Sequence, residues 1–208
     1  MKIFVIGNGP TQNNIDLGCL VNETTLAFND ITGRLHEFTP TYWMYFDLEV
    51  YRGYGGKMLE QKEKGTRFIS LHRHIEGAEI INAFGSIPSL RKGKMEFYDK
   101  KMGWIYSVGS IGYAGLQWAW QKGFREFYVM GFDSRDPRPA EHYMNGYCEM
   151  GKKKIGDSLP EGVWGKAYDY ANEWIWAHDG EIWDVSGCKC GSFRYKPIKE
   201  ALNGSVGR

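Results

Sequence analysis

The sequence lacks any long hydrophobic run, and since a membrane-spanning helix needs about 20 consecutive apolar residues, we expect no membrane span. Its first apolar run, from Lys2 to Ile6, is short and no small-residue cleavage site follows it, so we expect a strand there rather than a signal peptide. A charge excess is also absent. The net charge of +1 gives no reason to expect nucleic acid or an acidic membrane as a partner, and we expect a cytoplasmic protein.

Cysteine is scarce, and two phosphate-binding motifs are missing. The four cysteines, Cys19, Cys148, Cys188 and Cys190, do not form the paired C-x-x-C motifs of a zinc ribbon. We therefore expect free thiols in a reducing compartment. The dinucleotide fingerprint G-x-G-x-x-G would need glycine where Gln12 stands, and the sequence holds no P-loop motif.

What the sequence does contain is the composition of a folded protein, because 42% of its residues are hydrophobic and 15% are aromatic. Its 208 residues suffice for one large domain and are too few for two domains of typical size. We expect a single domain over residues 1–202. Within it, residues 134–164 are expected to form a lid or binding loop, and residues 203–208 to be a frayed tail.

The clearest pattern lies at the N-terminus, where the run KIFVI leads directly into GNGPT. A short run of β-branched and aromatic residues is typical of a strand buried on both faces. In the turn that follows, Gly7 and Gly9 would let the backbone approach a ligand, and Pro10 suits the first turn of a helix. Because α/β proteins bind phosphate where a strand ends in a glycine turn, we expect a nucleotide at Gly7–Thr11. The alternative is a plain strand-to-loop turn.

Apolar runs alternate with turn residues along the rest of the chain. They predict further strands at residues 24–28, 42–46, 66–71, 79–83, 127–130 and 181–185. They also predict helices at residues 110–123, 165–178 and 197–202, a short helix or loop at 13–20, and an irregular connection at 85–103. Gly123 would be the left-handed cap of the first of these helices. We expect an α/β fold with a mostly parallel sheet, helices on both faces, and the first strand at its centre.

Polar residues follow the predicted strands at the point where each strand ends. They are Asn8, Asn29, Asp30, Asp47 and Asp133. In an open parallel sheet ligands bind beyond the carboxyl ends of the strands, so these side chains are expected to converge on one rim. The amide of Asn29 can both donate and accept hydrogen bonds, which suits a base or a ribose, although asparagine is also common in turns.

Two further segments are candidates for the chemistry. The segment 109–112 (GSIG) opens a predicted helix, so Ser110 is a candidate N-cap and its helix start a second anion site. In the long loop, His142 is a candidate general base, and the hydroxyls of Tyr143 and Tyr147 could stabilise a leaving phosphate. His72 and His74 are weaker rivals for the role of base.

Taken in order, these segments resemble a known family. GNGPT, Asn29, the YFD of residues 45–47, GSIG, the KGFREFYVMGFD of residues 122–133 and the His142–Tyr143 pair are similar to the bacterial sialyltransferases of glycosyltransferase family 42. A related group of uncharacterised phage and bacterial proteins shares this layout. The resemblance covers most of residues 1–147 but is patchy between 48 and 104, and residues 180–202 resemble the end of that group. It implies a Rossmann-like nucleotide-sugar transferase fold.

The resemblance also implies an activity and roles for individual residues. The family transfers a sugar from a CMP-linked donor to a hydroxyl acceptor, with a histidine base and without metal or other cofactor. His142 would be that base, with Tyr143 and Tyr147 at the donor phosphate. The positions expected to contact the donor are Gly7, Asn8, Gly9, Pro10, Thr11, Asn29, Asp47, Ser110, Gly112 and Asp133. Two features depart from the family, since Asp47 stands where an amide is usual and the tyrosine-rich stretch before the histidine is absent.

Two alternatives remain open. The glycine turn and the GF-x-E-x-x-x-x-G-x-D pattern are also similar to 6-hydroxymethylpterin diphosphokinase-like proteins, which transfer pyrophosphate from ATP with Mg²⁺. Asp47, Asp133 and Asp136 would then be metal ligands. The other alternative is a nucleotide-binding interaction module without catalysis. The acceptor is not identified by the sequence, which is also compatible with a homo-oligomer.

Overall fold

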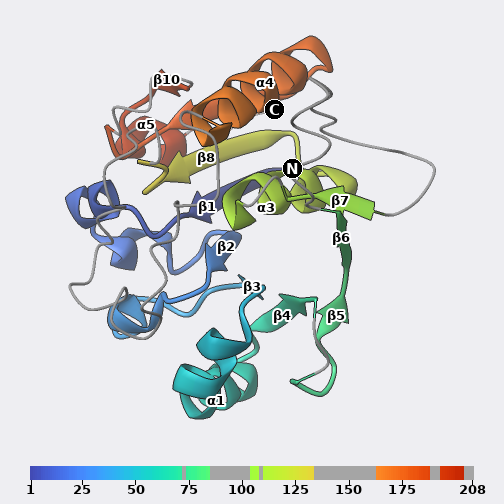
Figure 1. Ribbon diagram of the computed structural model, residues 1–208. Coiled ribbons are helices and arrows are strands. Elements are labelled where there is room, and N and C mark those ends of the chain that lie inside the picture. The colour runs from blue at the N-terminus through green and yellow to red at the C-terminus, as the bar shows by residue number, and fades with distance from the viewer. Residues whose placement is uncertain (72–73, 85–103, 108–109, 134–162, 188–192, 204–208) are drawn as a thin grey trace.

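A computed structural model describes residues 1–71, 74–84, 104–107, 110–133, 163–187 and 193–203 of the chain. Its centre is a sheet of eight parallel strands in the order β10-β9-β8-β1-β2-β3-β4-β5 (Figure 1). The strands of this sheet are β1 (Lys2–Ile6), β2 (Thr25–Phe28), β3 (Tyr42–Tyr45), β4 (Arg67–Ser70), β5 (Glu79–Ile80), β8 (Glu126–Met130), β9 (Glu181–Asp184) and β10 (Arg194–Tyr195). The expected α/β fold with a parallel sheet is confirmed.

Strand β1 lies inside the sheet, between β8 and β2, as its sequence predicts. Every residue from Ile3 to Ile6 is 0% exposed. Ile3 and Val5 pack on one face of the sheet, and Phe4 and Ile6 on the other. A strand with apolar side chains on both faces is stable only where helices cover both faces, and this sheet meets that condition.

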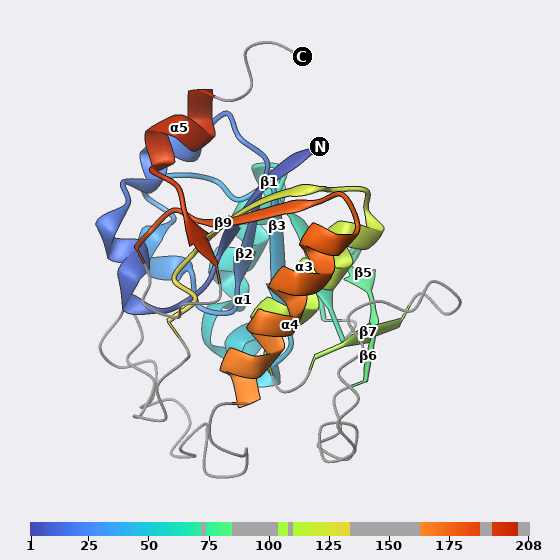
Figure 2. The same ribbon diagram turned by 90° about the horizontal axis from the view of Figure 1, so that it is seen from above.

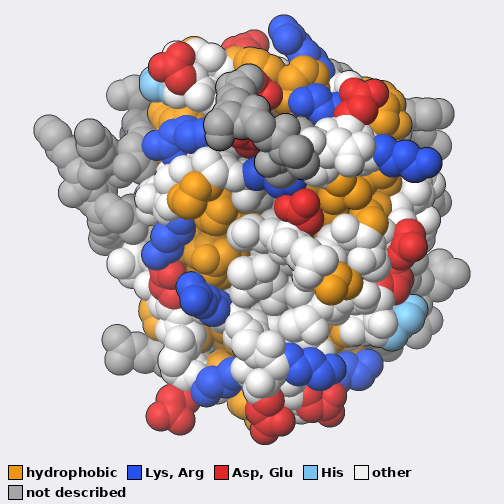
Figure 3. All heavy atoms as spheres, turned by 180° about the vertical axis from the view of Figure 1, so that it is seen from behind, with side chains coloured by type: hydrophobic (Ala, Val, Ile, Leu, Met, Phe, Trp, Pro, Cys, Tyr) orange, Lys and Arg blue, Asp and Glu red, His pale blue; other side chains and the backbone are white. Residues whose placement is uncertain are grey.

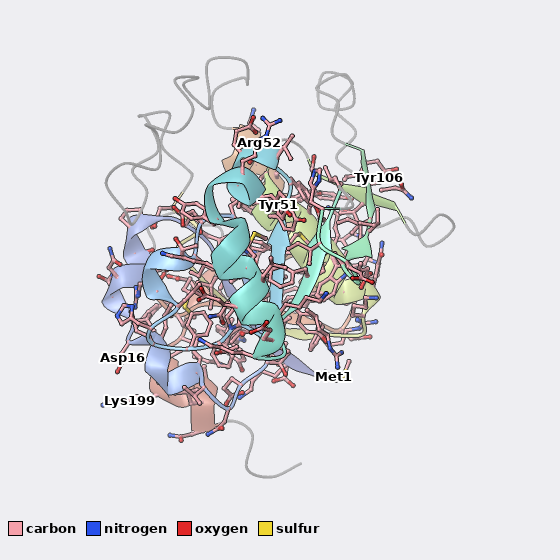
Figure 4. The ribbon with its side chains drawn as sticks, turned by 90° about the horizontal axis from the view of Figure 1, so that it is seen from below. Met1, Asp16, Tyr51, Arg52, Tyr106 and Lys199 are labelled. Atoms are coloured by element: carbon pink, nitrogen blue, oxygen red, sulfur yellow. The ribbon has the colours of Figure 1, made fainter. Side chains whose placement is uncertain are left out.

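The helices divide between the two faces of the sheet. Helices α3 (Ile111–Gln121) and α4 (Val163–Ala177) lie next to each other over one face (Figure 2). Helix α1 (Leu48–Glu63) covers part of the other face, shown in Figure 4. This second face also carries α5 (Ile198–Asn203) and the 3₁₀ helices η1 (Pro10–Asn14) and η2 (Leu17–Leu20), and a third, η3, spans Thr32–Arg34.

Most predicted elements are found with their ends shifted by a residue or two. Gly123 follows α3 with a φ of 90°, the left-handed conformation expected of a helix cap. The segment 13–20, predicted as a short helix or loop, falls in the two 3₁₀ helices η1 and η2. The predicted lid and the segment 85–103 lie outside the described residues. Within the described part, none of the helices is long and apolar enough to cross a membrane.

The prediction of one strand at residues 79–83 is wrong. Glu79–Ile80 form β5 at the edge of the main sheet, whereas β6 (Asn82–Phe84) pairs with β7 (Trp104–Tyr106) in a separate two-stranded sheet. The residue between them, Ile81, is buried and its N–H donates to the Ser70 carbonyl over 3.0 Å. The chain leaves the first sheet at this anchored residue, so one apolar run contributes a strand to each of the two sheets.

Helix α1 is absent from the sequence prediction. Its residues include Gly53, Gly55 and Gly56, which disfavour a helix, and it buries only Val50, Met58 and Gln61. These buried positions are spaced by eight and three residues, so they share one face of the helix. Burial against the sheet, rather than the intrinsic helix propensity of its residues, therefore stabilises α1.

Two helix glycines offer a matched test of this packing. A Cβ added to Gly115 in α3 would lie 2.3 Å from the Phe28 ring of β2, whereas one added to Gly56 in α1 would meet nothing within 4 Å. Alanine favours a helix by about 1 kcal/mol over glycine. We expect Gly56→Ala to raise the free energy of unfolding by about 0.5–1 kcal/mol and Gly115→Ala to lower it by about 1–3 kcal/mol, measured by urea denaturation. Equal stabilisation by both variants would contradict the close contact of α3 with β2.

Candidate functional site

The strand ends that were expected to converge do so at one edge of the sheet. Ile6 of β1 pairs with Ala27 of β2, so Asn8 and Asn29 each lie two residues beyond a paired position. On the other side of β1, Ile6 pairs with Met130 of β8. Because all strands of the sheet are parallel, the residues that follow β8, β1, β2 and β3 lie in that order along one rim.

The glycine turn after β1 lies directly against the residues that follow β8. A Cβ added to Gly7 would lie 2.4 Å from the Gly131 carbonyl oxygen, and one added to Gly9 would lie 2.2 Å from Oδ2 of Asp133. The Gly9 N–H donates to the Gly131 carbonyl over 2.8 Å. The two glycines thus allow close contact with the protein's own chain. The residues from Pro10 form a five-residue 3₁₀ helix, so this turn offers an anion few unoccupied N–H groups.

Thr11 and Asp133, both expected to contact a donor, bind each other. The Thr11 N–H donates to Oδ2 of Asp133 over 2.9 Å, and the Thr11 hydroxyl lies 2.7 Å from Oδ1. The same hydroxyl lies 3.1 Å from Oγ of Ser186, which in turn donates to Oδ1 of Asp184 over 3.0 Å. Two carboxylates and two hydroxyls thus connect the ends of β1, β8 and β9.

Ser186 and Asp184 are site residues that the sequence reasoning missed. Both lie at the end of β9, in the position along a strand that identified Asn8 and Asp133 as candidates. The signal was therefore present in the sequence. Both side chains are buried, so they stabilise the strand ends. Asp133, which is partly exposed, is the part of this network that a ligand could reach.

Asn8 and Asn29 each have a buried acceptor that is not used within the described chain. Their Oδ1 atoms are buried and accept no hydrogen bond from any described residue. The backbone of Asn29 is held firmly, since its N–H donates to the Met44 carbonyl over 3.0 Å and its carbonyl accepts from Nε1 of Trp43 over 2.8 Å. Its φ of 39° is uncommon for a residue other than glycine. A hydrogen-bond donor on a ligand would satisfy such an unpaired buried acceptor, and strained residues are frequent at binding sites.

The two aspartates near Asn29 differ in what they can reach. Asp30 is fully buried, and its carboxylate accepts from the Thr32 hydroxyl over 2.6 Å and from the Tyr54 hydroxyl over 2.7 Å. Burial, together with this bond to Asp30, raises the pKa of Tyr54 to about 12. Asp30 therefore anchors α1 to the end of β2. Asp47, which precedes α1, is exposed, so of these two carboxylates it is the one that faces solvent.

Ser110 caps helix α3 as its sequence predicts. Its Oγ accepts the Tyr113 N–H over 3.4 Å and lies 2.7 Å from the Tyr168 hydroxyl of α4. A Cβ on Gly112 would lie 2.8 Å from that same hydroxyl, so Gly112 allows α3 to approach α4. The first hydrogen bond within the helix comes from the Ala114 N–H, so the N–H groups of Ile111 and Gly112 have no acceptor inside α3. This helix start suits an anion better than the glycine turn does.

Several predicted residues fall outside the described part of the chain: His142, Tyr143, Tyr147, His72 and Asp136. Of the rim histidines only His74 is described, and its ring stacks on Tyr51 with 5.1 Å between ring centroids. Figure 4 shows Tyr51 and Arg52 at the start of α1, at the same end of the molecule as Tyr106. Among the described residues, no three His, Cys, Asp or Glu side chains are close enough to hold a metal ion together.

The hydroxyl of Thr11 can be tested separately from its backbone. Valine has nearly the same shape and keeps the N–H that donates to Asp133, but it removes the hydroxyl that links the Asp133 carboxylate to the Ser186 hydroxyl. A hydrogen bond to a charged group contributes about 1.5–3 kcal/mol, and we expect Thr11→Val to lower the free energy of unfolding by that amount. Thr24→Val, at the residue just before β2, is the control, with a change within about 0.5 kcal/mol. Equal effects in urea denaturation would show that the network does not stabilise the rim.

No protein-family model matches this sequence, and no curated protein matches it significantly. Solved structures do match. The first is the sialyltransferase CST-II in a variant with alanine in place of an asparagine, in complex with CMP; the TM-score is 0.58 at 14% identity, over 94% of this chain and 86% of that chain. A variant with phenylalanine in place of a tyrosine, also in complex with CMP, gives a TM-score of 0.53 at 13% identity, over 93% and 85% of the two chains.

A third solved structure is CstII from Campylobacter jejuni in complex with the substrate analogue CMP-3FNeuAc. It gives a TM-score of 0.50 at 13% identity, over 93% of this chain and 84% of that chain. These matches span nearly the whole of both molecules at low identity. The chain therefore shares the α/β fold of sialyltransferase structures.

Proposed function

We propose that the protein is a glycosyltransferase that uses a nucleotide-sugar donor, with a CMP-linked sugar favoured, and that the donor lies along the rim formed by the ends of β1, β2 and β3 and the start of α3. The fold shared with CMP-bound sialyltransferases supports this proposal. The order of the sequence motifs, which resembles glycosyltransferase family 42, supports it independently. Fold alone does not fix an activity, so the proposal depends on the chemistry of the rim.

The unused oxygens of Asn8 and Asn29 carry the proposal. Both are buried acceptors on neighbouring parallel strands, and a ligand with hydrogen-bond donors would satisfy them. Cytosine presents an amino group at the position where uracil presents a carbonyl oxygen. Acceptors at the rim therefore favour a cytidine nucleotide over a uridine nucleotide.

The phosphate would lie at the start of α3. The N–H groups of Ile111 and Gly112 have no acceptor inside the helix, and the helix dipole favours negative charge at this end. The carboxylates of Asp47 and Asp133 lie on the same rim and would repel a phosphate close to them. The α3 start therefore supports the phosphate better than the turn at Gly7–Thr11, whose N–H groups already bind the end of β8.

Catalysis in this proposal is direct displacement at the anomeric carbon of the donor sugar, without metal or other cofactor. His142 removes the proton from the acceptor hydroxyl as the new glycosidic bond forms. The bond to the nucleotide phosphate breaks, and the phosphate leaves toward Tyr143, Tyr147 and the start of α3, where fixed dipoles stabilise its charge.

Nucleotide binding tests the donor site directly. We expect calorimetry with EDTA present to show that CMP binds more tightly than UMP, GDP, AMP or ATP. Asn29→Ala removes a buried acceptor and should weaken CMP binding about tenfold or more, because a lost hydrogen bond of this kind costs about 1–3 kcal/mol. Asn22→Ala, at an exposed turn residue, is the matched control and should leave the affinity unchanged.

Other outcomes would replace the proposal. In a second series of titrations, with Mg²⁺ in place of EDTA, tighter binding of ATP than of CMP would favour pyrophosphate transfer, with Asp47, Asp133 and Asp136 as metal ligands. No binding of any of the five nucleotides would favour an interaction module without catalysis.

The base is tested by the rate at which CMP is released from a CMP-linked sugar with water as acceptor, because the natural acceptor is not identified. Loss of a general base costs about 10²–10⁴-fold in rate, so His142→Ala should lower turnover by that factor while leaving the affinity for CMP unchanged. His74→Ala is the matched control, since His74 follows β4 in the chain and is the rival candidate for the base. Loss of turnover in His74→Ala alone would place the base on that residue instead.

A further inference from the structure

A cavity of about 320 Å³ opens at the opposite end of the sheet from the donor rim. Its lining includes Tyr42, Arg67 and Glu79, which are the first residues of β3, β4 and β5. It also includes Trp118 and Lys122 from the C-terminal end of α3. On the face that carries the amino ends of the strands, apolar side chains lie in patches bordered by Lys and Arg side chains (Figure 3). The cavity shares no residue with the predicted donor site.

Aromatic rings and cations alternate in the lining. The Tyr42 and Trp118 rings pack edge to face with centroids 4.8 Å apart. The Arg67 guanidinium carbon lies 6.0 Å from the Tyr42 ring centroid, and Nζ of Lys122 lies 5.7 Å from that of Trp118. Cations held over aromatic rings at such distances are attracted to the ring face. Trp118 is only 2% exposed, so its ring offers no open face on which a flat base could stack.

The charges of the lining do not cancel. Glu79 accepts from Nε1 of Trp118 over 3.1 Å and pairs with Lys122 over 2.9 Å, so these two charges neutralise each other. Lys62, Arg67 and Glu76 remain, and within the described chain neither Lys62 nor Arg67 forms an ion pair. The lining therefore carries one positive charge in excess and favours an anionic ligand.

We propose that this cavity binds an anionic monosaccharide, either a sugar phosphate or a sugar acid. Its volume lies near the lower limit of about 300 Å³ for small-molecule sites, which suits one sugar ring. Lys62 and Arg67 hold the anionic group, since charge-assisted hydrogen bonds are the strong ones. The partly exposed Tyr42 ring, which packs on the buried Trp118, contacts the carbon framework of the sugar, and the Glu76 carboxylate accepts from its hydroxyls.

The proposed ligand site is separate from the donor rim. Strand β3 has four residues, so its two ends are about 10 Å apart, with Tyr42 at the cavity and Asp47 beyond the far end. Helix α3 spans about 16 Å from the capping Ser110 to Gln121, next to Lys122 of the cavity. Binding in the cavity therefore needs neither the nucleotide nor an active transferase.

Four probes separate the parts of the proposed ligand in calorimetric titrations of the full chain. They are glucose 6-phosphate, glucuronate, glucose and inorganic phosphate. We expect at least one of the two anionic sugars to bind saturably and about tenfold more tightly than either glucose or phosphate alone. The anionic sugar that binds identifies the class. Equal binding of inorganic phosphate, or no saturable binding of any probe, would overturn the proposal.

Variants of the lining then locate the binding. Arg67→Gln and Lys62→Gln should each weaken the bound sugar about tenfold and leave the affinity for CMP unchanged. Lys57→Gln is the matched control, because Lys57 is an exposed lysine of α1 outside the lining. All three are exposed residues, and thermal unfolding checks that each variant is folded. Sugar binding that none of the lining variants weakens would overturn the proposal, as would loss of CMP binding in parallel with the sugar.

Discussion

The contact between the end of β1 and the end of β8 sets the geometry of the whole rim. Gly7 and Gly9 lie so close to Gly131 and Asp133 that any added Cβ would fall 2.4 Å or less from an oxygen atom. This contact fixes where β1 ends and leads its chain into the 3₁₀ helix at Pro10–Asn14. It also brings Thr11 to Asp133, and through Ser186 it reaches the end of β9. A displaced β8 would therefore disturb the positions of the turn and of Asn8 together.

The polar residues of the rim divide by whether their groups are satisfied within the protein. Asp30 and Asp184 are buried and bonded to neighbouring hydroxyls, so they stabilise the strand ends. Asn8 and Asn29 have buried oxygens without a partner among the described residues, and these have an energetic cost that only a ligand or solvent would remove. Strand-end position thus identifies the rim, whereas hydrogen-bond satisfaction separates structural residues from candidate binding residues.

The sequence predicts the buried strands well because each is a short apolar run before a polar turn, as in β1 and β8. Helix α1 was not predictable in this way, because three glycines interrupt it and its stability comes from packing on the sheet. The pairing of Thr11 with Asp133 joins residues 122 positions apart and depends on the order of the strands, which residue patterns alone do not give. Ser186 and Asp184 could have been found, since they lie at the end of a strand that the sequence predicts.

A parallel sheet places unlike groups at its two ends, and the two proposed sites lie one at each end. At the carboxyl ends, helix α3 begins, and its first N–H groups, which have no acceptor inside the helix, suit a nucleotide together with the asparagine amides. At the amino ends α3 finishes, and its negative dipole end is met by Lys122, which Glu79 in turn neutralises. An anion at that end must therefore be held by side-chain cations, and Arg67 and Lys62 are in place for it. The two proposed sites thus differ in how they would hold an anion, with backbone dipoles at one and cationic side chains at the other.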